Sequence, residues 1–127
     1  MPLKTQNKTG LITNLAVNIV VVVSLIVLLI SIVGSYRPEI VMSGSMKPLL
    51  NEGDIVIAKK VGRDEIIRMG DIYTYQNPGV FGTVTHRCIR TEDEGGETVY
   101  VFKGDNNELE DEVRVKRSWI KYRLVRY

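Results

Sequence analysis

The sequence predicts a mainly β protein, in which one N-terminal transmembrane helix precedes a small antiparallel domain that resembles a β-barrel. Two observations indicate this class. Residues 9–36 contain no charged side chain, and residues 37–127, 91 in number, fall largely into short runs rich in Val, Ile, Thr and Tyr. Gly, Pro, Asn and Asp separate these runs, as is typical of strands and turns. We therefore expect a tail over 1–10, a membrane helix over 11–34 and a β domain over 37–127.

The helix prediction rests on residues 15–33, an apolar run of 19 residues that only Asn18, Ser24 and Ser31 interrupt. At about 1.5 Å per residue such a helix spans roughly 28 Å, close to the ~30 Å hydrocarbon core of a bilayer. The β-branched residues would suit a strand in water, but a single segment in lipid satisfies its backbone only as a helix. A cleaved secretory signal is the alternative, although its apolar region is usually ~7–15 residues long.

Charge predicts the orientation of this helix. Lys4 and Lys8 are the only charged residues before Arg37, and the rest of the chain is neutral, with 15 Lys+Arg and 15 Asp+Glu. Basic residues beside a membrane helix stay in the cytoplasm, so we expect a single-pass protein of the cell membrane whose β domain is extracytoplasmic. A net charge of +2 is too small for a nucleic-acid partner. One cysteine and one histidine exclude a Cys/His zinc site, and we expect no metal or cofactor.

Six strands are expected in the β domain, over residues 40–42, 54–61, 71–76, 82–90, 97–103 and 120–125. Residues 108–115 suit a short helix or a turn. The turn signal in 92–96 predicts a hairpin, which sets His86 opposite roughly residue 102, to within about two positions. Strand alternation places His86 on an inner face with Val84 and Cys88.

A loop that carries two serines follows the apolar run. In Ser43-Gly44-Ser45-Met46-Lys47-Pro48, the glycine permits a tight turn and the proline cannot continue a central strand. A serine hydroxyl needs a neighbouring base before it becomes a good nucleophile. The sequence therefore predicts a tight, shaped loop in which Ser45 is a candidate nucleophile. With the site at the bilayer surface, we also expect Met46 to contact lipid.

His86 is the candidate base for Ser45, because histidine titrates near pH ~6.5 and can accept a hydroxyl proton at neutral pH. A carboxylate behind the ring would fix its tautomer, and both Asp105 and Asp111 are candidates for that role. The hairpin brings residues 103–105 near His86 and so favours Asp105. Ser43 is positioned to offer its hydroxyl to an oxyanion.

Five short motifs, in this order, resemble those of the type I signal peptidases. They are Ser43–Pro48, Gly53–Val56, Gly70–Ile72, Thr85–Arg87 and Lys103–Asn107. The resemblance runs from the apolar segment to about residue 111, and it is specific because all five occur in order behind the expected anchor. Most bacterial members have lysine at the position of the base. A histidine there resembles the archaeal, endoplasmic-reticulum and spore-former branch, which uses Ser, His and Asp.

The resemblance implies a membrane-anchored serine endopeptidase that cleaves N-terminal signal peptides from exported precursors after small residues at −3 and −1. By position, Ser45 resembles the nucleophile, His86 the general base and Ser43 the oxyanion helper. The family pattern favours Asp111 as the third triad member, with Asp105 as the other candidate.

Expected partners are precursors that carry signal peptides, the lipid bilayer and accessory subunits of the kind that endoplasmic-reticulum relatives have. The substrate is expected to bind extended beside residues 40–42. The alternative function is a non-catalytic, membrane-anchored β module that binds a partner. A structure with Ser45 and His86 more than ~8 Å apart, with no loop movement that could join them, would favour this module.

Overall fold

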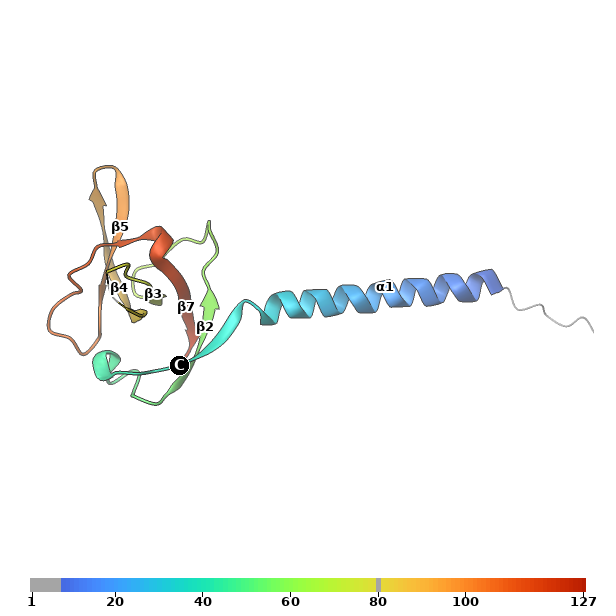
Figure 1. Ribbon diagram of the computed structural model, residues 1–127, viewed down its shortest axis with the longest axis horizontal. Helices are drawn as coiled ribbons and strands as arrows, with labels where there is room; N and C mark the ends of the chain where they lie inside the picture. The colour runs from blue at the N-terminus through green and yellow to red at the C-terminus, as the bar shows by residue number, and fades with distance from the viewer. Residues whose placement is uncertain (1–7, 80) are drawn as a thin grey trace, which may run out of the picture. The chain divides into compact units, whose positions relative to one another are not determined.

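The computed structural model describes residues 8–79 and 81–127, which divide into an N-terminal helical unit and a β unit that begins at Tyr36 (Figure 1). Most of the predicted tail over 1–10, Lys4 included, lies outside the described residues. The side chain of Lys8 is likewise outside them.

The helix α1 covers Lys8–Val33, whereas the sequence predicted 11–34. Its segment Ile12–Val33 is long and apolar enough to cross a membrane. The hydroxyls of Ser24 and Ser31 each donate to the carbonyl four residues earlier, at 2.8 Å. These two polar groups are therefore satisfied within the helix, as an apolar environment requires.

The β unit contains one antiparallel sheet of seven strands in the order β1-β2-β7-β3-β4-β5-β6. The strands are β1 Tyr36–Ile40, β2 Ile55–Lys60, β3 Ile72–Tyr75, β4 Val84–Glu94, β5 Glu97–Lys103, β6 Val115–Lys116 and β7 Ile120–Arg126. Two 3₁₀ helices join them, η1 Gly44–Met46 and η2 Arg117–Trp119. The sheet curls into a half-barrel with β1 and β6 at its edges (Figure 1). The predicted mainly β class is confirmed.

Two elements differ from the prediction. The first strand lies at Tyr36–Ile40 and not at 40–42, because it pairs with β2 from Tyr36↔Lys59 to Ile40↔Ile55. Residues 108–114 form an irregular segment, and β6 begins at Val115 by pairing with β5. Both differences arise from pairing with distant strands, which local composition does not report.

The β4–β5 hairpin forms where the turn signal predicted it. Glu94 pairs with Glu97, and Gly95 and Gly96 occupy the turn with φ of 65° and 87°, which favour glycine. At the other end Arg87 pairs with Lys103. His86 therefore lies beside residues 103–104, within the expected tolerance.

Two buried clusters form the core of the β unit. One surrounds Phe102, whose ring centroid is 4.8 Å from that of Tyr75, and the other lies beneath the serine loop. The second cluster contains Met46, Leu50, Val56, Ala58, Ile72 and Leu124. Met46 is only 2% exposed, so the expectation that it reaches lipid is wrong. Its burial anchors the chain immediately after Ser45.

Candidate active site

The loop that carries Ser45 is held from both sides. Met46 is buried after it, and the Leu50 N–H donates to the Met46 carbonyl at 3.0 Å. From the segment after β5, Asn106 donates its backbone N–H to the Ser45 carbonyl at 2.8 Å and its side-chain amide to the Gly44 carbonyl at 3.2 Å. Ser45 thus lies on a short 3₁₀ turn that is held by the buried Met46 after it and by Asn106 from a distant part of the chain.

Ser45, His86 and Asp111 form a continuous chain of hydrogen bonds. Ser45 Oγ lies 3.0 Å from His86 Nε2, and His86 Nδ1 lies 2.9 and 2.7 Å from the two carboxylate oxygens of Asp111. His86 comes from β4 and is 8% exposed, as strand alternation predicted. The structure brings these three residues together although 41 and 25 positions separate them in the sequence.

The surroundings of Asp111 indicate which nitrogen of His86 carries the proton. Burial opposes ionisation of Asp111, but hydrogen bonds from His86 and Tyr75 outweigh it and hold the pKa of this carboxyl below its ordinary value. An ionised carboxylate only accepts hydrogen bonds, so His86 Nδ1 carries the proton. In the neutral ring, Nε2 is then the nitrogen with a free lone pair and faces the hydroxyl of Ser45, which is the tautomer that a general base requires.

Ser43 lies in the serine loop, immediately before η1. Its hydroxyl oxygen is 3.2 Å from Ser45 Oγ, within hydrogen-bonding distance. Its side chain is exposed, and it lines the same groove as Ser45 and His86. This position allows the hydroxyl to reach a group that reacts at Ser45.

Asp105 has a different neighbour from the one that the hairpin argument favoured. Its carboxylate receives two hydrogen bonds from the Arg87 guanidinium, at 2.8 and 2.6 Å, and the same guanidinium donates to the Gly70 carbonyl at 2.5 Å. Strand alternation directs Arg87 to the face opposite His86. The hairpin does bring residues 103–105 beside β4, but the Asp105 carboxylate binds Arg87 and ties the 104–107 turn to β4.

Four charged side chains support the segment that carries Asp111. Arg90 pairs with Glu92 and Glu110, and Arg114 pairs with the same two carboxylates. Hydrogen bonding from Arg90 lowers the pKa of Glu110 to about 2. Arg114 also donates to the Asp111 carbonyl at 3.2 Å. Since these side chains are 27–41% exposed, the network's main effect is to restrain the segment, and its contribution to stability is small.

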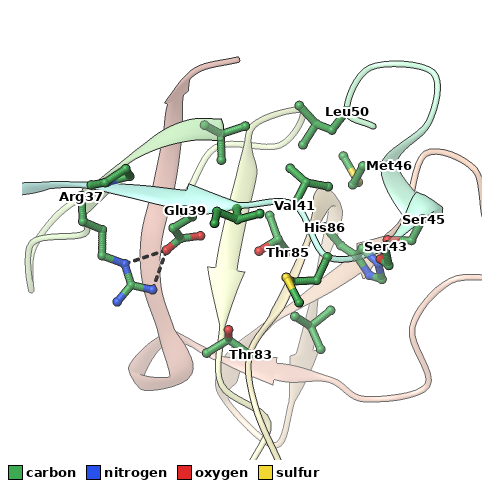
Figure 2. Close-up of a pocket in the computed structure, with 15 residues that line it drawn as sticks. Arg37, Glu39, Val41, Ser43, Ser45, Met46, Leu50, Thr83, Thr85 and His86 are labelled. Atoms are coloured by element: carbon green, nitrogen blue, oxygen red, sulfur yellow. Dashed lines mark hydrogen bonds and ion pairs between the residues drawn. The ribbon is translucent and has the colours of Figure 1, made fainter. Parts of the chain in front are cut away.

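A groove of about 660 Å³ leads to Ser45 (Figure 2). Its lining includes residues 37–43 from β1 and the following loop, and Thr83–His86 from the start of β4. Figure 2 shows Ser43, Ser45 and His86 together at one end of the groove, and the Arg37–Glu39 ion pair at the other. Because β1 is an edge strand, an extended peptide can add beside it.

Two contributors to this site were not predicted from the sequence. Tyr75 donates its hydroxyl to Asp111 Oδ2 at 2.7 Å, and Asn106 holds the serine loop. Tyr75 was recognisable in part, because it occupies a predicted strand that neighbours the strand of His86. Asn106 belongs to the quoted Lys103–Asn107 motif, but its partner lies 61 positions away, a separation that local patterns do not report.

The fold and the site together define a class of protein. A hydrogen-bonded Ser–His–Asp chain at the end of a groove is the arrangement that serine hydrolases use on several unrelated folds. In this protein the three residues are positioned by a curled β-sheet. The same polypeptide also contains a helix long enough to cross a membrane.

Comparison with known proteins identifies the family. The chain is 34% identical over 101 residues to the signal peptidase complex catalytic subunit SEC11C of human and of dog, and this match covers 76% of the chain. It is 35% identical over 81 residues, or 63% of the chain, to the catalytic subunit SEC11 of Scheffersomyces stipitis. No family model matches the chain. The chain is a homologue of these catalytic subunits and so belongs to the type I signal peptidase family.

The matches cover 52% of the SEC11C proteins and 48% of the yeast protein. The chain therefore spans about half the length of the curated relatives that it matches.

Proposed function

We propose that this chain is a membrane-anchored serine endopeptidase that removes N-terminal signal peptides from exported precursors. One observation carries the proposal: Ser45 Oγ lies 3.0 Å from His86 Nε2, and His86 Nδ1 lies 2.7 Å from Asp111. A large separation of Ser45 and His86 would have favoured the alternative, a non-catalytic β module, so this distance argues against it. The relatives named as signal peptidase catalytic subunits support the same reaction.

In the proposed mechanism, His86 Nε2 takes the proton of Ser45 while Oγ attacks the scissile carbonyl carbon. The imidazolium that forms is stabilised by the Asp111 carboxylate. The Ser43 hydroxyl and the Ser45 backbone N–H stabilise the oxyanion of the tetrahedral intermediate. His86 then donates its proton to the leaving amine, and a water activated by the same ring hydrolyses the acyl ester on Ser45.

The groove supports an extended substrate with small side chains next to the cleaved bond. Its wall beside Ser45 contains Val41, Met46 and Leu50, and the last two are each only 2% exposed. A floor of buried, close-packed side chains leaves little depth for a large residue. We therefore assign small residues to the substrate positions −1 and −3, with its backbone adding beside the edge strand β1.

The location and partners of the enzyme follow from α1 and from the relatives. In this proposal α1 spans the cell membrane once, with the N-terminus cytoplasmic and the β unit extracytoplasmic. An anchor confines the enzyme to the bilayer that also holds the apolar segment of its substrate, and this raises their effective concentration. The relatives are named as subunits of a complex, which supports accessory subunits as partners here also.

The test is cleavage of one radiolabelled precursor by the detergent-purified full chain in lipid vesicles, with Ser45→Ala as the matched inactive variant. We expect cleavage at a single site after a small residue, and a loss of at least about 1,000-fold in Ser45→Ala. Ser43→Ala should retain measurable cleavage, reduced about 100-fold. Equal cleavage by wild type and Ser45→Ala would refute the assignment. Cleavage that depends on Ser45 in native membranes, but is lost on purification, would show that accessory subunits are needed.

A further inference from the structure

Tyr75 lies in the core of the β unit and binds the carboxylate behind the histidine. It is 2% exposed, and its hydroxyl donates to Asp111 Oδ2 at 2.7 Å. We propose that Tyr75 is a positioning residue for the relay, by which we mean the hydrogen-bonded Ser45, His86 and Asp111. Tyr75 acts through Asp111, because it fixes the orientation of the carboxylate towards His86 Nδ1. The catalytic consequence rests on the proposed function, but the effect on His86 is measurable without any activity.

Asp111 needs a second point of attachment because it lies on an irregular segment. Its backbone N–H donates to the Phe102 carbonyl at 2.8 Å, which places the main chain but leaves the side chain free to rotate. His86 Nδ1 lies 2.9 and 2.7 Å from the two carboxylate oxygens. The hydroxyl of Tyr75 binds Oδ2 from β3, the strand beside that of His86, so side chains from two strands hold the carboxylate.

The surroundings of Tyr75 hold its side chain in place for the hydrogen bond to Asp111. All four residues of β3 are buried, and the strand lies between β4 and β7 in the sheet. Tyr75 pairs with Val84 on one side and Ile120 on the other, and its ring packs against Phe102 at 4.8 Å. Burial and the bond to Asp111 both raise the pKa of Tyr75, so the phenol keeps its proton and remains a donor.

The charged groups around Asp111 come from several elements. His86 of β4 and Tyr75 of β3 hydrogen-bond the carboxylate itself. Glu110 precedes Asp111 in the chain and its negative charge works against ionisation, while Arg114 donates to the Asp111 carbonyl and pairs with Glu110. Removing the Tyr75 hydroxyl takes away one of the two side chains that hydrogen-bond the carboxylate.

The same strand provides a matched control. Tyr73 is fully buried, and its ring also contacts Phe102, with 6.2 Å between centroids. Its hydroxyl, however, accepts a hydrogen bond from the Arg68 N–H at 3.0 Å. Tyr73→Phe and Tyr75→Phe each delete one buried hydroxyl from β3, but only the second deletes a contact with Asp111. A purely structural role for these tyrosines predicts similar effects from the two variants.

The kinetic test compares the two variants in the precursor cleavage assay. Tyr75→Phe should lower kcat about tenfold, equivalent to ~1.4 kcal/mol of transition-state stabilisation, with KM unchanged within about twofold. Tyr73→Phe should leave both constants within about twofold of wild type. Thermal unfolding followed by circular dichroism should show that both variants are folded. Equal kcat losses in the two variants would overturn the proposal.

The spectroscopic test uses the fact that His86 is the chain's only histidine. NMR of protein with ¹⁵N-labelled imidazole reports the Nδ1–H proton without ambiguity. In Tyr75→Phe this resonance should shift and exchange faster with water, whereas in Tyr73→Phe it should match wild type. An unchanged resonance in Tyr75→Phe would overturn the proposal. If the Nδ1–H resonance shifts as expected but the protein shows no Ser45-dependent cleavage, the positioning role of Tyr75 is upheld and only the proposed function is refuted.

Discussion

Replacing Gly104 with alanine tests how closely the segment after β5 packs against the nucleophile loop. A Cβ on Gly104 would lie 2.7 Å from the Ser45 carbonyl oxygen and 2.8 Å from Asn107 Nδ2. The Asn107 side chain can rotate away, but the Ser45 oxygen belongs to the backbone. Ordinary contact begins near 3.4 Å, so the Ser45 backbone and the new methyl group must separate by about 0.7 Å.

This displacement is large compared with the tolerance of the site. If Ser45 moves by the full amount directly away from His86, the distance from Ser45 Oγ to His86 Nε2 grows from 3.0 Å to about 3.7 Å, beyond the range of a hydrogen bond. A misplacement of about 1 Å can lower an enzymatic rate on the order of 100-fold. We therefore expect Gly104→Ala to lower kcat by about 10- to 100-fold, and to destabilise the fold by ~1–3 kcal/mol as other overpacking changes do.

The assay is steady-state cleavage of a precursor at saturating substrate, with thermal unfolding measured in parallel. Gly62→Ala is the control, since the nearest heavy atom to its Cβ would be Glu65 Cβ at 3.9 Å, an ordinary contact. The control should retain kcat within about twofold. If Gly104→Ala also keeps wild-type kcat while folded, the contact between the 104–107 turn and Ser45 does not position the nucleophile, and the reasoning fails.

Three further predictions follow from the contacts of individual carboxylates. Asp105→Asn breaks the ion pair with Arg87 and should lower kcat by about tenfold or less in cleavage assays. Asp111→Asn should lower kcat on the order of 10⁴-fold. Equal losses of kcat in the two variants would contradict these roles. Burial opposes ionisation of Asp111, but its hydrogen bonds lower its pKa in the folded state, so its contribution to stability is present above pH ~4 and is lost as pH falls through that lowered value. Thermal unfolding should therefore show a smaller fall in Tm below pH ~4 for Asp111→Asn than for wild type, and identical curves would refute this linkage. Glu39→Gln removes the charge that pairs with Arg37 at the far end of the groove. If this pair contributes to substrate binding, KM should rise about two- to fivefold with kcat unchanged. A fall in kcat with KM unchanged would contradict that role.

Local properties of the sequence predicted the type and approximate place of most elements. An apolar run of 19 residues predicted α1, and alternation placed His86 on a buried face of β4. The Gly95–Gly96 turn predicted the register of the hairpin to within two positions. These features depend on residues close together in the chain. The shift of β1 to Tyr36–Ile40 was missed because its bounds depend on pairing with β2.

Local sequence patterns were enough to predict a serine loop, a histidine strand and two candidate aspartates, and the order of their motifs indicated the family. Which aspartate contacts the histidine depends on the tertiary structure. The segment over 104–114 has no periodic pattern, so its course depends on long-range contacts: Arg87 holds Asp105, and the Phe102 carbonyl and Tyr75 hold Asp111. The two aspartates lie six positions apart, yet their side chains bind partners on opposite faces of β4, because successive residues of a strand point to opposite sides of the sheet.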